Sequence, residues 1–571
     1  MSAGRALAAF VVLVLCAASR ASAQVAPNAH WRTIDTKHFH VHFTPALEPV
    51  ARRAAVSAER AYDALAAQLH PPRGPIDLVV ADNVDYANGS TTPFPTNRII
   101  VYAHPPLDDI ALRSYDDWLS LVITHEMTHA FYLDRTRGWW RVAQHVFGRS
   151  PALFPNLYEP GWLTEGLAVY YESALTGFGR VHGSYERMIV GSTARSAGLL
   201  GMDTWSLATT RYPGGDIPYG YGGLFLDYLA RTRGRASIGK FVETSSGSTI
   251  PFRLNHMARQ GFGESFSEGW RGWRASILAG ITPEHAPMKG WRDLTTDGRL
   301  ADFPRWLDDT SLVFAAANGK QSFGVDRVTT HGADTRLSRR NGDSPNVPLA
   351  DGSLVYSQLE LTDPYHMYSD LYRERNGAVT RLTHGARLAE VDARGDGALV
   401  AVRYGGAARQ LVRVTADGRT IAPITGASPD TEWTEPRWSP DGRKIAAARW
   451  TRGGITEIVV LDTAGRTLRV LVRDRSSNAQ PEWTRDGASI VFSSDRSGAS
   501  QLYRVGASGG AIRRISDATT GLFNPAISPN GKRIAAIRWE SDGYHVGVAP
   551  MDSIVGVSPP PAVVAREDGE S

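Results

Sequence analysis

The 571-residue sequence is almost without cysteine, since Cys16 is the only one. Cys16 lies in a short apolar run, residues 6–18, which follows Arg5 and precedes Ala21-Ser22-Ala23. A positive start, an apolar run and small residues before a cleavage point predict a signal peptide over residues 1–23. We therefore expect an exported protein, periplasmic or secreted, whose mature chain contains no disulfide and depends on hydrophobic cores for stability.

Long apolar runs and blocks of like charge are also missing from the rest of the chain. No later stretch is apolar enough to predict a transmembrane helix, so we expect no integral membrane segment after signal cleavage. The net charge is only +4, and the pI of about 9.0 reflects arginines spread along the whole sequence. This pattern gives no indication of a nucleic-acid partner.

The most informative motif is His125-Glu126-Met127-Thr128-His129. Apolar residues on both sides predict a helix, and on a helix two histidines four positions apart lie on the same face. They can offer two imidazole nitrogens to one Zn²⁺, with the Glu126 carboxylate placed as a general base. The alternative is a core helix whose histidines only form internal hydrogen bonds.

A third zinc ligand is predicted downstream, at Glu165. Gly166 would let another backbone approach, and the block Trp-x-x-Glu-Gly-x-Ala-x-Tyr-x-Glu begins at Trp162. This block resembles the third-ligand helix of the gluzincin metallopeptidases, which include thermolysin and the zinc aminopeptidases. The resemblance implies that His125, His129 and Glu165 are zinc ligands and that Glu126 is the general base. Glu172 is either an acceptor that orients a ligating imidazole or a solvated glutamate.

The spacing departs from that family, because 35 residues separate His129 from Glu165. The insert contains the apolar pairs Trp139-Trp140 and Val146-Phe147, and we expect it to pack as a hairpin or to form a wall of the substrate site. Glu159, just before a proline, is the fallback third ligand.

The segment that begins Pro218-Tyr219-Gly220-Tyr221-Gly222 resembles the part of zinc aminopeptidases in which a tyrosine is followed three residues later by glycine. There the tyrosine donates a hydrogen bond to the developing oxyanion, which implies a catalytic role for Tyr219. Tyr221 is the second candidate, and a tyrosine that only packs in the core is the alternative for both.

Residues 24–290 mix predicted strands at 38–43, 76–80 and 98–102 with predicted helices, the first over 47–69. This composition suits an α+β, gluzincin-like metallopeptidase domain. We expect residues 97–103 to form the edge strand that aligns a substrate beside the site. The glycine-rich motif that binds a free amino terminus in zinc aminopeptidases is missing, which favours an endopeptidase.

Residues 291–556 are repetitive. Blocks related to Pro436-Arg437-Trp438-Ser439-Pro440-Asp441-Gly442 recur in steps of 41 to 47 residues, and each has a turn followed by an alternating apolar strand. A period of this length accommodates four strands and predicts an all-β propeller of about six blades. The repeats resemble those of TolB-like propellers. We expect a disordered tail over residues 557–571.

The leading hypothesis is an exported zinc metallopeptidase in which metal-activated water, with Glu126 as general base, hydrolyses peptide or protein substrates. The propeller would dock substrates or an envelope protein partner, and the signal peptide and repeats indicate a bacterial envelope. An alternative is a catalytically inactive envelope binding or assembly protein that acts through its propeller. A zinc hydrolase of non-peptide bonds is a third hypothesis. A serine hydrolase of the prolyl oligopeptidase type is disfavoured, because no Gly-x-Ser-x-Gly motif occurs.

Overall fold

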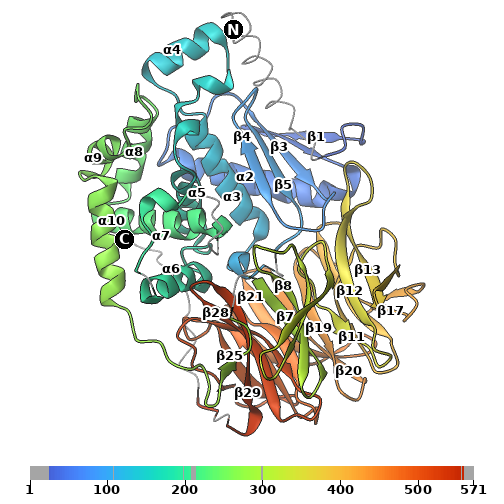
Figure 1. Cartoon of the computed structure of the whole chain (residues 1–571). Coiled ribbons are helices and arrows are strands. Elements are labelled where there is room, and N and C mark those ends of the chain that lie inside the picture. Colours follow the sequence, from blue (N-terminus) through green and yellow to red (C-terminus); the bar gives the residue numbers. More distant parts are fainter. Residues whose placement is uncertain are drawn as a thin grey trace, which may run out of the picture.

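The computed structural model describes residues 25–106, 109–196, 198–206, 214–296, 300–553 and 556–558. The predicted signal peptide and nearly all of the predicted disordered tail lie outside these residues. The chain forms an N-terminal α/β part and a C-terminal β-propeller (Figure 1). Within the described ranges, no helix has both the length and the apolar character needed to cross a membrane.

A five-stranded sheet forms one layer of the N-terminal part, in the order β1-β2-β3-β5-β4. The three central strands are parallel, and β1 and β4 run antiparallel to their neighbours at the two edges. The predicted strands at 38–43, 76–80 and 98–102 are confirmed as β2, β3 and β5. The bounds are β1 (Arg32–Asp35), β2 (Phe39–Phe43), β3 (Ile76–Ala81), β4 (Gly89–Thr92) and β5 (Arg98–Tyr102).

Helices form the rest of this part. The predicted helix over 47–69 is α2, and the helix that carries the His-Glu-x-x-His motif is α3. Helix α3 begins after Asp117, and the Asp117 side chain accepts a hydrogen bond from the Ser120 N–H. Nearly every residue of α3 is buried, as expected for a helix that is covered on all sides. The helices are α2 (Glu48–Ala66), α3 (Trp118–Leu133), α4 (Gly138–Phe147), α5 (Gly161–Thr176), α6 (Ser184–Ser196), α7 (Ile217–Arg233), α8 (Ala236–Ser245), α9 (Leu254–Phe262) and α10 (Phe266–Ala279).

Six four-stranded antiparallel sheets form the propeller, as the repeat length predicts. Five of them are built from consecutive strands. The blades are β7 (Leu300–Asp308), β8 (Ser311–Ala317), β9 (Gly324–Thr329) and β10 (Asp334–Arg339); β11 (Val347–Pro348), β12 (Leu354–Leu361), β13 (Met367–Arg375) and β14 (Ala378–Arg381); β15 (Leu388–Ala393), β16 (Leu399–Gly405), β17 (Ala408–Val414) and β18 (Ile421–Pro423); β19 (Thr431–Trp438), β20 (Lys444–Thr451), β21 (Ile455–Asp462) and β22 (Thr467–Asp474); β23 (Ala479–Trp483), β24 (Ser489–Ser494), β25 (Gln501–Gly506) and β26 (Arg513–Arg514); and β27 (Leu522–Ile527), β28 (Arg533–Glu540), β29 (Gly543–Pro550) and β6 (Arg292–Asp293).

The sixth blade takes its outer strand from the other end of the propeller sequence. Strand β6, which follows α10 and precedes the first blade, pairs antiparallel with β29. The last blade is therefore completed by residues that come before the first, and this pairing closes the ring of blades.

Polar side chains on the innermost strands also connect neighbouring blades, and most of them bond to the backbone of the next blade. Glu390 Oε2 accepts from the Glu435 N–H at 2.6 Å, and Glu435 Oε2 accepts from the Gln480 N–H at 2.6 Å. Gln480 Oε1 accepts from the Asn524 N–H at 2.8 Å, and the Asn524 side chain donates to Asp302. These bonds supply acceptors to N–H groups that buried bulges in the strands leave without ladder partners.

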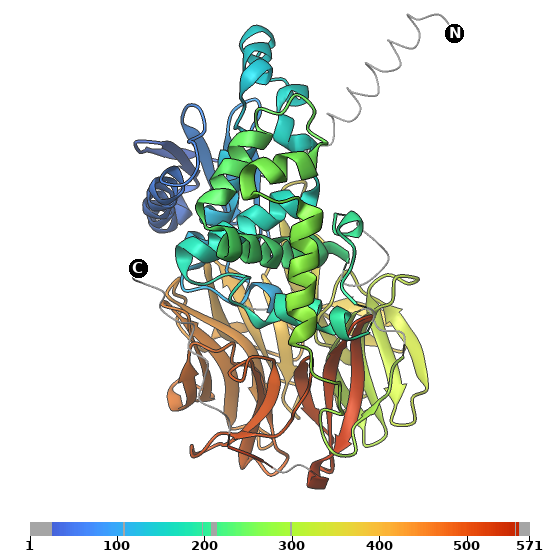
Figure 2. The same cartoon turned by 90° about the vertical axis from the view of Figure 1, so that its left-hand side faces the viewer.

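The propeller lies against the N-terminal part, as the two perpendicular views show (Figure 2). Arg387 of the propeller lies between two carboxylates that follow β3, with Nη2 at 2.6 Å from Asp82 Oδ1 and Nε at 2.7 Å from Asp85 Oδ1. Just before α3, Arg113 Nη2 is 2.6 Å from Glu435 Oε1 of the propeller. These ion pairs connect the propeller to the loop after β3 and to the segment that precedes α3.

Candidate metal centre

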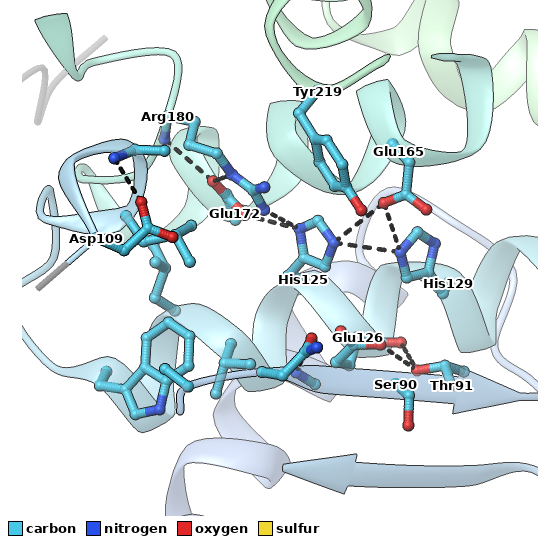
Figure 3. A pocket seen from close by; sticks show the side chains of 18 of the residues that line it. Ser90, Thr91, Asp109, His125, Glu126, His129, Glu165, Glu172, Arg180 and Tyr219 are labelled. Carbon is cyan, nitrogen blue, oxygen red and sulfur yellow. Dashed lines mark hydrogen bonds and ion pairs between the residues drawn. The ribbon is translucent and has the colours of Figure 1, made fainter. Parts of the chain in front are cut away.

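Helices α3 and α5 bring three potential metal ligands together (Figure 3). His129 Nε2 lies 3.2 Å from His125 Nε2. Glu165 Oε2 lies 3.5 Å from His125 Nε2 and 3.4 Å from His129 Nε2. The three atoms form a nearly equilateral triangle, although Glu165 comes from a separate helix.

This triangle has the dimensions that a tetrahedral zinc site requires. With bonds of about 2.1 Å and tetrahedral angles, two ligand atoms of one zinc ion are about 3.4 Å apart. Two imidazole nitrogens and one carboxylate oxygen are also a donor set that catalytic zinc sites use. Among the described residues, this is the group of histidine and acidic side chains whose ligand atoms converge in this way.

The electrostatics of the triangle favour a cation. Burial opposes ionisation of Glu165, but hydrogen bonds to His125 and His129 lower the pKa of Glu165 far below its usual range. Burial and the Arg180 guanidinium oppose a charge on His125, but Glu165 and Glu172 outweigh them and raise the pKa of His125 to about 9. A metal ion that binds His125 must displace this proton, so binding is coupled to pH.

The orientation of His125 is set by Glu172, two helical turns after Glu165 on α5. Glu172 is fully buried, and its Oε2 lies 2.7 Å from His125 Nδ1. Burial works against its charge, but the Arg180 guanidinium lowers the pKa of Glu172 to about 2. The ionised carboxylate can only accept, so it accepts from Nδ1–H, and a metal ion that displaces the Nε2 proton would meet a lone pair directed at Glu165 and His129.

Arg180, in the loop after α5, was not identified from the sequence. Its Nε and Nη2 donate to the two oxygens of Glu172 at 3.0 and 2.8 Å, and its backbone N–H donates at 3.0 Å. Its guanidinium also lies over the Tyr219 ring, 4.7 Å from the centroid. The sequence offers only a weak signal for Arg180, which is the glycine before it. Gly179 is needed there because its φ is +91° and a Cβ would lie 2.7 Å from the Ser173 Oγ.

Glu126 lies on the side of α3 that faces β4. Thr91 Oγ1 of this strand donates to Glu126 Oε2 at 2.7 Å. Gly89 lies so close that a Cβ there would be 2.6 Å from Glu126 Oε1. Strand β4 therefore holds the proposed general base in place through one hydroxyl and one glycine.

The predicted position of the edge strand is wrong. Residues 97–103 contain β5, which lies between β3 and β4, and the strand at the edge beside Glu126 is β4. Its sequence, Gly-Ser-Thr-Thr, is short and polar, and small polar residues give little indication of a strand. It becomes a strand because the edge of β5 is available for pairing.

The structure separates the two candidate tyrosines. Tyr219 lines the same pocket as His125, His129 and Glu165, and its ring centroid is 6.3 Å from that of His125. Burial and the Glu165 carboxylate raise the pKa of Tyr219 well above its usual value. Tyr221 is fully buried instead in an aromatic core, with its ring 5.2 Å from Trp205.

A close helix contact fixes the position of Tyr219 relative to Glu165. A Cβ on Gly166 of α5 would lie 2.6 Å from the Gly222 backbone of α7. A Cβ on Gly222 would lie 2.1 Å from the Trp162 carbonyl oxygen. The expectation that Gly166 allows another backbone to approach is confirmed, and the approaching backbone is that of Gly222 in α7, the helix that carries Tyr219.

The insert between His129 and Glu165 brings neither the fallback ligand to the triangle nor a tryptophan-lined wall to the site. Glu159 lies away from the triangle, where it accepts a hydrogen bond from the Tyr132 hydroxyl. Burial without a cationic partner raises the pKa of Glu159 to about 8. Among the described residues of the insert, only Leu133 and Thr164 line the pocket, so the tryptophan-containing segment is not a wall of the site.

The pocket around the triangle has a volume of about 490 Å³. Among the described residues, all those that line it belong to the N-terminal part, and none comes from the propeller. It contains one guanidinium and six carboxyl groups, and burial raises the pKa of two of these carboxyl groups, those of Glu186 and Asp216. The ionisable residues are Arg180, Asp109, Glu126, Glu165, Glu172, Glu186 and Asp216.

Comparison with known proteins identifies the propeller. Residues 427–555 match the family described as the TolB beta propeller domain. An uncharacterized protein of Agrobacterium fabrum is 30% identical over 107 residues, which are 19% of this chain and 36% of that protein. The uncharacterized peptidase YuxL of Bacillus subtilis is 30% identical over 107 residues, which are 18% of this chain and 16% of YuxL. The C-terminal part is a TolB-like six-bladed β-propeller.

Solved structures with similar folds cover about half of this chain. TolB from Acinetobacter baumannii is 18% identical and covers 55% of this chain and 73% of its own, with a TM-score of 0.30. A puromycin-hydrolyzing peptidase from Mycobacterium tuberculosis is 20% identical and covers 48% of this chain and 49% of its own, with a TM-score of 0.34. The chain spans at most about a third of the length of the two curated relatives given above.

Proposed function

We propose that the N-terminal part is a zinc-dependent metallopeptidase of the gluzincin type, which hydrolyses peptide bonds within exported protein or peptide substrates. One observation carries the proposal: a single pocket contains the triangle of His125, His129 and Glu165 together with Glu126 and Tyr219. The donor set fits zinc, and the other two side chains are those that peptide hydrolysis requires.

Each side chain has a defined task in this reaction. Bound zinc would supply Lewis acidity, which activates a water molecule and polarises a carbonyl group. Glu126, held by Thr91, takes a proton from the attacking water and passes it to the leaving amine. Tyr219 donates its O–H hydrogen bond to the oxygen that becomes negative in the tetrahedral intermediate.

Strand β4 supports internal cleavage. It pairs with β5 on one side only, and residues 88–91 line the pocket. An extended peptide can add to such an edge through backbone hydrogen bonds, which bind any sequence and need no chain terminus. We infer that the substrate lies along β4 and that its chain continues out of the pocket in both directions.

The charge of the pocket indicates a substrate class. With six carboxyl groups and one guanidinium among its lining residues, the pocket favours cations, although burial raises the pKa of Glu186 and Asp216. We therefore expect peptides with lysine or arginine near the cleaved bond to be better substrates than acidic ones. The propeller, which contributes none of the described lining residues, would dock substrates or an envelope partner at a distance from the reaction.

Glu126→Gln tests the proposal directly. Loss of the general base should lower kcat by roughly 10²- to 10⁴-fold, with unchanged zinc content because Glu126 is not a ligand. Metal analysis and cleavage of a peptide library measure the two quantities. Glu159→Gln is the matched control, since this glutamate is equally buried but lies outside the pocket, and it should keep its activity. Bound zinc without any Glu126-dependent cleavage would favour the alternative of an inactive binding protein.

A further inference from the structure

Helix α4 projects from the end of the molecule that lies opposite the propeller (Figures 1 and 2). It packs through Trp140 and Gln144 and leaves most of its other side chains exposed. Trp139, Val142 and Val146, at spacing i, i+3 and i+7, share one exposed face, with exposed fractions of 45%, 65% and 67%. A monomeric protein in water gains nothing from such a face.

The exposed apolar surface continues beyond α4. Phe147 at the end of the helix is 75% exposed, and Phe252 in the loop before α9 is 70% exposed. Ring contacts connect the two segments: Trp140 is 6.3 Å from Tyr158, which is 6.2 Å from Phe252. The α4 patch is defined here by its exposed apolar residues, Trp139, Val142, Val146, Phe147, Leu157, Tyr158, Ile250 and Phe252.

The two segments that form the α4 patch are basic in sequence. Residues 135–158 contain four arginines and no acidic residue, and residues 248–260 contain two arginines and no acidic residue. Arg135 and Arg137 pair with Glu243, and Arg149 pairs with Asp134, whereas Arg141 and Arg253 are exposed beside the apolar side chains. Tryptophan, phenylalanine and valine beside arginine, on a helix that lies on the surface, are typical of a segment that binds the interface of an anionic bilayer.

Hydrogen bonds to the rest of the protein fix α4 without any partner. The Trp140 Nε1–H donates to the Ser248 carbonyl at 2.8 Å, and the Arg137 N–H donates to the Ser246 carbonyl at 2.8 Å. The Gln144 side chain accepts from Arg73 Nη2 at 2.6 Å. Because α4 is fixed at these points, little conformational entropy is lost when its exposed face becomes covered.

We propose that the α4 patch docks the N-terminal part onto the surface of an anionic lipid bilayer. The apolar side chains enter the boundary between headgroups and acyl chains, and Arg141 and Arg253 lie at the level of the phosphates. No segment crosses the bilayer in this arrangement. The proposal is independent of the peptidase reaction, since no residue of the patch lines the pocket among the residues described.

Co-sedimentation of the purified protein with vesicles tests this. We expect binding to vesicles of equal parts phosphatidylglycerol and phosphatidylcholine, and much weaker binding to pure phosphatidylcholine or in high salt. The triple variant Val142→Ser, Val146→Ser, Phe147→Ser should lose roughly tenfold or more of the partition coefficient. Arg141→Gln with Arg253→Gln should lose about fivefold for each charge removed.

The matched control replaces three apolar residues that are similarly exposed elsewhere, Val56→Ser, Leu361→Ser and Val379→Ser. It should bind vesicles like the unmodified protein, and thermal unfolding should show that both triple variants are folded. Absence of binding to anionic vesicles, or equal binding by the two triple variants, would overturn the proposal. So would light scattering that shows a dimer abolished by the α4 triple variant without vesicle binding, because the patch would then serve a second copy.

Discussion

The propeller and the pocket both bury polar side chains, but they satisfy them in different ways. In the propeller, Glu435 and Gln480 each accept a hydrogen bond from a backbone N–H of the next blade, so the chain itself supplies their partners. In the pocket, one ligand atom each of His125, His129 and Glu165 converge, at separations of 3.2 to 3.5 Å. The first arrangement pairs donors with acceptors, whereas the second brings three potential metal ligands together. Buried polar groups thus connect blades in one region and gather potential ligands in the other.

After Glu126→Gln, the largest effect that distinguishes the pocket from the propeller should come from Tyr219→Phe. The phenol hydroxyl stabilises negative charge only in the transition state, so kcat should fall by roughly 10²- to 10³-fold with little change in zinc content. Tyr221→Phe is the control, because this ring is buried beside Trp205 away from the pocket. Steady-state kinetics with one readily cleaved peptide measures kcat for both variants. Equal losses of kcat would contradict the proposed role of Tyr219.

A smaller effect is expected for Glu172→Gln. The carboxylate fixes the tautomer of His125, so its loss should weaken zinc binding by roughly 10- to 100-fold. Competition with a chromogenic chelator measures this affinity. Glu186→Gln is the control, since Glu186 is also buried, lines the pocket and lies near Arg180, but forms no hydrogen bond or ion pair with His125 among the described residues. If the two variants lose affinity equally, the effect comes from replacing any buried carboxyl group of the pocket and not from His125 orientation.

The smallest effect is expected in the propeller. Gln480→Ala removes the acceptor of the Asn524 N–H and of the Ser493 hydroxyl, both buried, and should lower the free energy of unfolding by about 1–3 kcal/mol. Urea unfolding measures the change, and zinc content should not differ. Gln321→Ala, at an exposed glutamine of the propeller, should have no effect. A change in zinc content in the Gln480 variant would show that the two regions are coupled.

Local sequence patterns predicted much of this architecture. The alternation in β2 and the repeat length of the blades depend on neighbouring residues, so they are visible without coordinates. The pairing of β4 is different, because its polar residues form a strand only where β5 presents an edge. The strand that holds Glu126 could therefore not be predicted from its own residues.

The site residues also differ in whether a local pattern or a long-range contact places them. His125 and His129 are one helical turn apart, so their proximity follows from the helix alone. Arg180 lies 55 residues beyond His125 and reaches it only through a loop after α5, which no periodicity indicates. The sequence left the role of Glu172 open, because the burial of this side chain depends on the packing of α5 against α3. In the structure, Glu172 is fully buried and hydrogen-bonded to His125.

The pairing of β6 with β29 has a consequence for how the protein is made. Strand β6 leaves the ribosome before any blade, and its partner emerges only after five blades and most of the sixth have been synthesised. Until then the edge of β6 is open, and closing so long a loop is slow. We expect nascent chains that stop before β29 to expose two unpaired sheet edges and to be targets for chaperones.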